Sequence, residues 1–132
     1  MNTWLDDRGH SYMDIFSEAP MEGQVNFSVV NPGVIKAWHR HKHQTDFWMI
    51  VSGDAKVGLY DQEKGEARAY YIGEHNPRVI EIPPGIWHGL TPVGGKPCAI
   101  LYYVTRKYDP QNPDEERASY DAFPFDWEVK HR

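Results

Sequence analysis

The chain has 132 residues, a length typical of one domain with a single hydrophobic core. Hydrophobic residues make up 40% of it and charged residues 25%, so we expect a folded globular protein and exclude disorder. The formal net charge is −5 and basic residues are not clustered, which excludes nucleic acid as a partner because phosphate binding needs a concentrated positive surface.

Hydropathy argues against a membrane partner. A membrane span needs about 18 consecutive apolar residues, and no such stretch occurs. Residues 1–7 are polar and lack the apolar segment of a signal peptide, so we expect a cytoplasmic location. The single cysteine, Cys98, lies in an apolar run and is expected to be a buried, inert thiol.

In chain order, residues 1–23 are predicted to form an amino-terminal arm, where a short helical period is confined to residues 12–18. Residues 24–108 contain short runs rich in β-branched and aromatic residues, broken about every 8 to 12 residues by Gly, Pro, Asn or Asp. This pattern predicts an all-β sandwich or barrel. The predicted strands are 25–30, 34–38, 47–51, 56–60, 67–72, 79–82 and 99–104.

Three polar or glycine-containing breaks are predicted to be hairpin connections, at residues 52–54, 61–65 and 94–95. The tail, residues 109–132, is rich in Pro and Asp, yet it holds four aromatic residues between Tyr120 and Trp127. It is too aromatic for a free linker, so we expect it to pack on the barrel. The whole chain, 1–132, is therefore predicted to be one domain.

Two histidine motifs resemble those of cupins. In the first, Gly33 is followed after five residues by His39, then by His41, Asp46 and Gly53, with Asp where the pattern usually carries Glu. The second is Pro-Pro-Gly-Ile-Trp-His, residues 83–88. Because the two motifs are independent, we predict a double-stranded jelly-roll (cupin) barrel with a histidine-lined cavity.

Alternate side chains of a strand share a face, so His39 and His41 can point together into such a barrel. Asp46 and His88 would join them from neighbouring strands. The set His39, His41, Asp46 and His88 suits divalent iron, zinc, manganese, nickel or copper. His43 falls outside this ligand spacing and is expected to be a solvated surface residue.

Over almost the whole chain, the sequence resembles the dTDP-4-dehydrorhamnose 3,5-epimerase family, as a short and divergent member. The matching segments are residues 6–9, 33–39, 82–89, 102–110, 112–116 and 120–121. The resemblance implies a jelly-roll isomerase that acts on a sugar nucleotide of the dTDP-4-keto-6-deoxyhexose type and requires no cofactor.

The resemblance also implies roles for single residues. His39 corresponds to the base that removes a proton next to the sugar ketone, and Tyr102 to the acid that returns one from the opposite face. Such a base needs a pKa near the working pH, which is typical of histidine, and the enolate oxygen must be stabilised. Lys36 and His88 are the candidates for that stabilisation.

Three further residues are implied in substrate binding. Arg8 would reach the nucleotide phosphate, in the partner subunit of a homodimer whose amino-terminal arms cross over. Trp38 and Trp87 flank the histidines, where an aromatic ring can stack on a base or sugar, although both could be packing residues.

The sequence departs from the family at several positions. Lys36 replaces an arginine, His41 a glutamine, and Asp46 a lysine that helps to hold the enolate. The printed sequence stops shortly after Trp127, before the aspartate that partners the base histidine in full-length members. His39 is thus expected to lack that partner unless Asp46 or another acid substitutes.

Three functions stay open at this point: a sugar-nucleotide epimerase without metal, a metal-dependent cupin enzyme acting on a small molecule, and a sugar-binding cupin without catalysis. The segment His39-Arg40-His41-Lys42 is also similar to the 3,4-ketoisomerases of related dTDP-sugars, so the type of isomerisation is open too.

Overall fold

The structure is a computed structural model that describes residues 1–128, apart from the side chain of Trp4. Residues 1–128 contain no helix, and hence none long and apolar enough to cross a membrane. The strands are β1 (Asn2–Asp6), β2 (Gly9–Met13), β3 (Gln24–Val30), β4 (Lys36–Arg40), β5 (Asp46–Ser52), β6 (Asp54–Asp61), β7 (Glu66–Gly73), β8 (Ile80–Ile82), β9 (Trp87–Val93), β10 (Cys98–Val104) and β11 (Glu116–Arg117).

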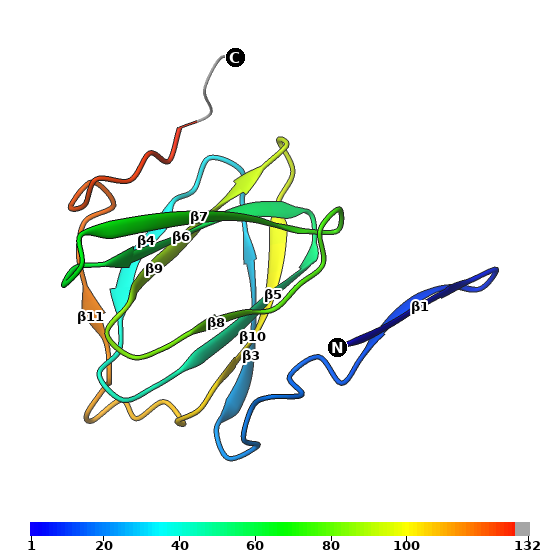
Figure 1. Cartoon of the computed structure of the whole chain (residues 1–132), viewed down its shortest axis with the longest axis horizontal. Helices are drawn as coiled ribbons and strands as arrows, with labels where there is room; N and C mark the ends of the chain where they lie inside the picture. The colour runs from blue at the N-terminus through cyan, green and yellow to red at the C-terminus, as the bar shows by residue number, and fades with distance from the viewer. Residues whose placement is uncertain (129–132) are drawn as a thin grey trace.

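Two antiparallel sheets form the barrel. One has four strands in the order β3-β10-β5-β8, and the other has five in the order β11-β4-β9-β6-β7. They curve around a common interior, which Figure 1 shows nearly end on. The predicted all-β jelly-roll class is confirmed.

The strand predictions are confirmed for β3 to β8 and for β10, each within a few residues of its observed bounds. The sequence pattern predicts no strand over β9, because Gly89 and Pro92 interrupt its run of β-forming residues. Gly89 is needed there: a Cβ atom on it would lie 2.4 Å from the Cβ atom of Ala37 on β4.

Two of the three predicted hairpins are wrong. Residues 61–65 do join a hairpin, since β6 and β7 pair over their whole length. The turns at 52–54 and 94–95 instead carry the chain from one sheet to the other, because β5 and β10 pair together in the four-stranded sheet, while β6 and β9 pair in the five-stranded sheet. In a sequence, a turn between sheets uses the same glycine and polar residues as a hairpin.

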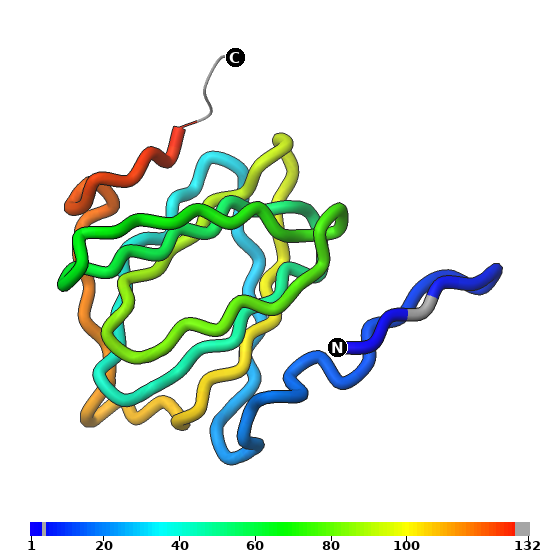
Figure 2. Tube along the Cα trace, in the orientation of Figure 1, coloured from blue at the N-terminus to red at the C-terminus, as the bar shows by residue number. Residues whose placement is uncertain are grey.

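The arm differs from the helical period expected at 12–18. Strands β1 and β2 pair as a hairpin that ends at Met13, and turns follow. Figure 2 shows this hairpin projecting away from the barrel at the blue end of the chain. It makes few contacts with the barrel, so its residues are mostly exposed.

The interior holds the main hydrophobic core, which includes Ile50, Val57, Ile72 and the cysteine Cys98. Burial raises the pKa of the Cys98 thiol to about 11, as expected for an inert residue. A second cluster lies on the outer surface of the five-stranded sheet and contains Trp38, Tyr60, Trp87 and Trp127.

The tail covers this outer cluster. The ring centroids of Phe123, Phe125 and Trp127 lie 5.7, 5.4 and 5.1 Å from that of Trp38. A Cβ atom on Gly58 of β6 would come within 2.8 Å of the Phe125 and Trp127 rings, so this strand glycine admits the tail. Residues 129–132 of the predicted tail lie outside the described residues.

Candidate functional site

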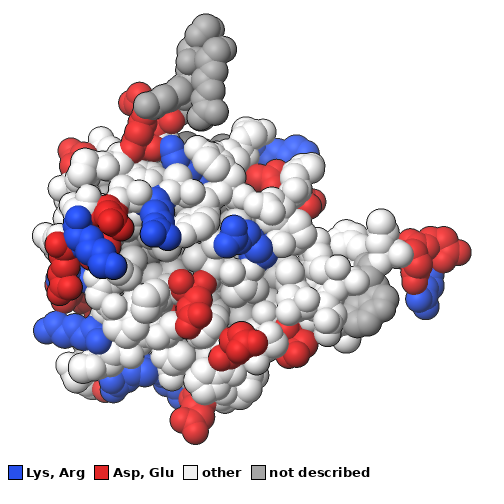
Figure 3. Space-filling model, viewed as in Figure 1, with Lys and Arg blue, Asp and Glu red and all other residues white. Residues whose placement is uncertain are grey.

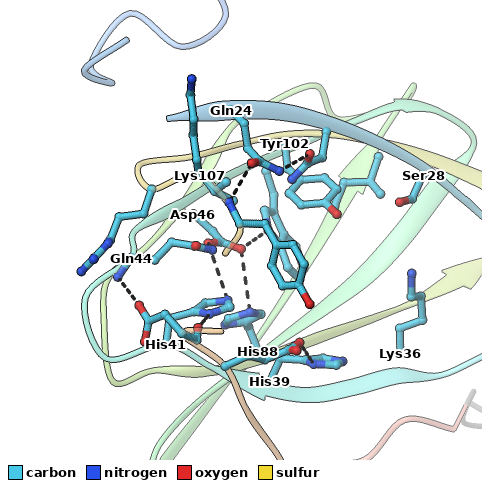
Figure 4. Close-up of a pocket in the computed structure, with 18 of the residues that line it drawn as sticks. Gln24, Ser28, Lys36, His39, His41, Gln44, Asp46, His88, Tyr102 and Lys107 are labelled. Carbon is cyan, nitrogen blue, oxygen red and sulfur yellow. Dashed lines mark hydrogen bonds and ion pairs between the residues drawn. The ribbon is translucent and has the colours of Figure 1, made fainter. Parts of the chain in front are cut away.

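A cavity of about 390 Å³ opens between the two sheets. In Figure 4, His39, His41 and His88 lie on one side of it, with Gln24, Ser28 and Tyr102 across from them. The histidines come from β4, the residue after it and β9, whereas Tyr102 comes from β10 of the facing sheet. The cavity therefore presents imidazoles and a phenol from opposite walls.

The pairing of β4 with β9 explains why three side chains of one short segment face inward. Its register shifts between Lys36 and His39, so that these residues, three apart, both line the cavity. His41 follows by ordinary alternation. His39 pairs directly with His88, and their ring centroids are 6.4 Å apart.

Each cavity histidine is anchored through Nδ1 by an acceptor. The Nδ1 atom of His39 lies 2.8 Å from a carboxylate oxygen of Glu115, and that of His88 lies 3.1 Å from the carbonyl oxygen of Ile86. The Nδ1 atom of His41 contacts the carbonyl oxygen of Asp114. Because these oxygens can only accept, Nδ1 carries the proton in each neutral ring, which leaves Nε2 with its lone pair.

Asp46 lies between two of these lone pairs. Its carboxylate oxygens are 3.8 Å from Nε2 of His41 and 3.9 Å from Nε2 of His88. Asp46 is 3% exposed and accepts hydrogen bonds from the side chains of Gln44, at 2.7 Å, and Trp48, at 3.1 Å. Three electron-pair donors thus converge on one buried point.

The charge state of His88 follows from its surroundings. Burial lowers the pKa of His88 from 6.5 to about 4, against the opposing effect of the Asp46 carboxylate. The ring is therefore neutral at pH 7. A neutral His88 with its proton on Nδ1 can accept a hydrogen bond from a bound molecule but cannot donate one through Nε2.

The segment before β11 holds the His41 loop. The Asp114 carboxylate accepts hydrogen bonds from the backbone N–H groups of Lys42, His43 and Gln44, at 2.8, 3.0 and 3.1 Å. Burial opposes ionisation of Asp114, but these three bonds outweigh it and lower its pKa. His43 itself is exposed and does not line the cavity.

The structure brings together three of the four metal ligands predicted from the sequence. The ligand atoms of His41, Asp46 and His88 all lie within 4.8 Å of one another. His39 is outside this group and is paired with Glu115 instead.

Three of the predicted substrate-binding residues lie away from the cavity. Trp38 and Trp87 are 0% and 5% exposed, and both belong to the outer cluster. Their neighbours His39 and His88 point inward, so alternation along the strand turns the tryptophans outward. Arg8 lies on the projecting hairpin and pairs with Asp6.

Sequence reasoning missed several cavity residues. Glu115 and Asp114 come from the tail, which carries no cupin motif, and their contacts depend on where β11 pairs. Lys107 and Tyr108 also line the cavity, from the segment that follows β10. The family resemblance at residues 102–110 and 112–116 is the one sequence signal that points to this region.

The fold and the site together define a cupin, a jelly roll whose cavity is lined by histidines. The chain belongs to the family described as Polysaccharide biosynthesis C-terminal domain, which matches residues 4–116. It is 42% identical over 117 residues to the spore coat polysaccharide biosynthesis protein SpsL of Bacillus subtilis, covering 83% of this chain and 78% of that protein.

Other relatives are named as epimerases or isomerases. The probable low-salt glycan biosynthesis epimerase Agl13 of Haloferax volcanii is 38% identical over 95% of this chain and 88% of its own length. A dTDP sugar isomerase from Desulfovibrio desulfuricans superimposes with a TM-score of 0.83 at 28% identity, over 96% of this chain and 86% of that one. The dTDP-4-dehydrorhamnose 3,5-epimerase of Sulfolobus tokodaii shares the fold, with a TM-score of 0.76 at 24% identity, over 97% and 78% of the two chains.

Proposed function

We propose that this protein is a nucleotide-sugar epimerase or isomerase that moves protons next to a ketone, with His39 as base and Tyr102 as acid. One observation carries the assignment of roles: the two side chains line the same cavity from opposite sheets. Exchanging the configuration of a carbon requires that a proton leave one face and return to the other. A sugar ring held between the two sheets would present one face to each residue.

The tautomer of His39 suits the first step. With its proton on Nδ1 facing Glu115, the neutral ring offers the Nε2 lone pair as a base. The proton alpha to the ketone moves to Nε2, and the electron pair of the C–H bond forms a carbon–carbon double bond. The π pair of the C=O bond moves to the ketone oxygen, which gives the enolate. Tyr102 then returns a proton to the carbon from the other side.

The enolate oxygen needs a positive or proton-donating group. Lys36 lines the cavity beside the histidines and carries a positive charge, so we assign this role to its ammonium group. His88 was the other candidate from the sequence. Its neutral ring bonds to Ile86 through Nδ1, so it suits the acceptance of a hydrogen bond from a sugar hydroxyl.

Solvent exchange tests this function directly. Metal-free protein incubated in D₂O with dTDP-4-keto-6-deoxyglucose should incorporate deuterium at the carbon next to the ketone, as measured by proton NMR. The Tyr102→Phe variant should still incorporate deuterium at a position where His39 both removes and returns the proton, but it should yield less epimer. Tyr71→Phe, at an exposed tyrosine that does not line the cavity, should behave like the wild type. Absence of exchange with His39 intact would contradict the proposal for this sugar class.

A metal-dependent activity is the second candidate, and the convergence of His41, Asp46 and His88 favours it. Two Nε2 lone pairs facing one carboxylate match the donors that zinc and iron(II) prefer. These three residues would hold the ion, which would polarise a carbonyl oxygen as a Lewis acid. His39 would keep its role as base in either case.

Metal analysis separates the two candidates. Purified protein is stripped with chelator, incubated with zinc or iron(II), desalted and analysed by mass spectrometry, beside an Asp46→Asn variant. Stoichiometric metal that is lost in the variant supports the second candidate. If the wild-type protein retains no metal and still exchanges deuterium, the result supports the first candidate, the epimerase or isomerase without metal.

We also propose a homodimer. Strand β3 lies at the edge of its sheet, and its outward residues Val25, Phe27 and Val29 are 53%, 60% and 59% exposed. A second copy could cover this apolar stripe, and the projecting hairpin could carry Arg8 across to it. Light scattering should give twice the chain mass for the wild type and a monomer for Phe27→Lys. A wild-type monomer would contradict the proposal.

The face seen in Figure 3 carries acidic and basic side chains interspersed rather than a field of one sign. This mixture is compatible with a small-molecule substrate as the main partner. The cytoplasmic location expected from the sequence stays a prediction, which detection of the native protein in cell fractions would test.

A further inference from the structure

We infer that Glu115 is the positioning residue of His39: it holds the imidazole in the tautomer and orientation that the base requires. This inference rests on the proposed function for its activity measurements. Its first support is the contact of 2.8 Å between a Glu115 carboxylate oxygen and Nδ1 of His39. Both side chains are 28% exposed, so the pair lies at the wall of the cavity, partly shielded from water.

The local backbone places Glu115 on the correct face. In the pairing of β11 with β4, Arg117 lies opposite His39, and Glu116 lies opposite Arg40. Alternation then puts Glu115 and Arg117 on the side of His39, and both line the cavity. Glu116 points the other way and binds the Arg40 guanidinium at 2.7 Å.

The outer cluster fixes this pairing. Immediately after β11, Ala118 exchanges two backbone hydrogen bonds with Trp38, of 2.9 and 3.0 Å. Trp38 is fully buried and is the residue directly before His39. The two chain segments that carry the imidazole and the carboxylate are thus hydrogen-bonded to each other one residue before His39 and three residues after Glu115.

Glu115 is also in the right charge state. Burial opposes its ionisation, but hydrogen bonds from Arg117, at 3.2 Å, and from His39 outweigh that effect and lower the pKa of Glu115. An ionised carboxylate can only accept, so it holds the His39 proton on Nδ1. Among the described residues, no other acidic side chain pairs with a ring nitrogen of His39; Asp46 faces His41 and His88.

The tail therefore contributes to the chemistry as well as to packing. Without Glu115, the His39 ring could turn or move its proton to Nε2, and a ring with Nε2 protonated has no lone pair for the substrate. Loss of orientation at a reacting centre costs roughly 10- to 100-fold in rate.

The test compares Glu115→Ala with Glu116→Ala, which removes the neighbouring carboxylate from the opposite face. Deuterium incorporation into dTDP-4-keto-6-deoxyglucose is measured at several substrate concentrations, with and without sodium formate, and sodium chloride serves as the salt control. NMR of protein labelled with ¹⁵N-histidine reports the tautomer of His39 in the absence of substrate. Melting temperatures monitor folding.

We expect Glu115→Ala to lower kcat about 10- to 100-fold with little change in KM, to lose the Nδ1-protonated tautomer, and to be rescued in part by formate. Glu116→Ala should change none of these. A wild-type rate in Glu115→Ala, or a lost rate with an unchanged His39 tautomer, would overturn the inference. If the wild type does not exchange deuterium at all, the proposed function fails for this substrate, while the tautomer measurement still decides the role of Glu115.

Discussion

Strands β4 and β9 each have an outer face and a cavity face, and two adjacent residues on each strand lie on these opposite faces. On each strand, a tryptophan of the outer cluster is followed by a histidine of the cavity: Trp38 by His39, and Trp87 by His88. The outer face is sealed by aromatic rings of the tail, whereas the inner face holds imidazoles and a buried carboxylate. One short motif thus supplies both the anchor of the tail and the reactive groups.

This contrast explains how polar groups persist inside a small barrel. Burying an ionisable group costs free energy unless it is paired, and each cavity histidine has an acceptor at Nδ1. Two of those acceptors, on Asp114 and Glu115, belong to the tail that the outer cluster holds in place. Packing on the outer face therefore helps to orient the histidines on the inner face.

The largest expected effect is on the reaction rate and comes from replacing the proposed base on the inner face. His39→Gln should lower the rate of deuterium incorporation about 10²- to 10⁴-fold, because the base is lost. The free energy of unfolding should change little, since His39 is partly exposed. His43→Gln, an exposed neighbour, is the control and should keep the wild-type rate. Equal rates in the two variants would remove His39 from the mechanism.

Breaking the outer face should act on stability. Trp38→Ala removes a fully buried ring that contacts three tail aromatics, so urea denaturation should show a loss of about 3–5 kcal/mol. Tyr71→Ala, at a half-exposed aromatic residue, should cost less than about 1 kcal/mol. A small loss in Trp38→Ala would mean that the tail does not seal this face.

The pH dependence of stability reports on the inner face. His88 takes up a proton near pH 6.5 in the unfolded chain but near pH 4 in the folded one. The unfolded state therefore binds more protons between these pH values. The contribution of His88 to the free energy of unfolding is complete above pH 6.5 and is lost as the pH falls toward 4. The loss is on the order of 3 kcal/mol at most.

Urea denaturation of the metal-free protein between pH 4 and 7 measures this slope. The lowered pKa values of Asp114 and Glu115 act in the same direction, mainly toward the acid end. His88→Gln should flatten the curve between pH 5 and 6.5, where carboxylates contribute least. An unchanged slope in His88→Gln would contradict the burial of a neutral imidazole.

The smallest expected effect sharpens the account of tail docking. In Gly58→Ala, the new methyl group would lie 2.8 Å from the Phe125 and Trp127 rings, so the tail must shift. Thermal or urea unfolding should show a loss of about 1–3 kcal/mol. A gain in stability, as alanine often brings to a strand, would show that the tail does not approach this glycine.

Much of this architecture could be predicted from the sequence because it depends on local patterns. Turn residues between apolar runs indicate a barrel, and the spacing of His39, His41 and His88 indicates a shared cavity. The two motifs do not say which strand face a neighbouring residue takes, so Trp38 and Trp87 were expected at the substrate although they pack outside.

The partner of His39 could not be predicted for a related reason. Glu115 lies 76 residues away in sequence, and its contact depends on the register of the two-residue strand β11. Pairings of such short strands leave no periodic signal. Likewise, whether 52–54 turns back or crosses between sheets depends on the barrel as a whole.

A crystal structure with a bound dTDP-sugar, such as dTDP-rhamnose, tests the central claim most directly. We expect the hexose between the two sheets, with the carbon next to C4 about 3–3.5 Å from Nε2 of His39 and Tyr102 on the other face of the ring. A sugar bound elsewhere, or a hexose whose faces meet neither side chain, would contradict this account.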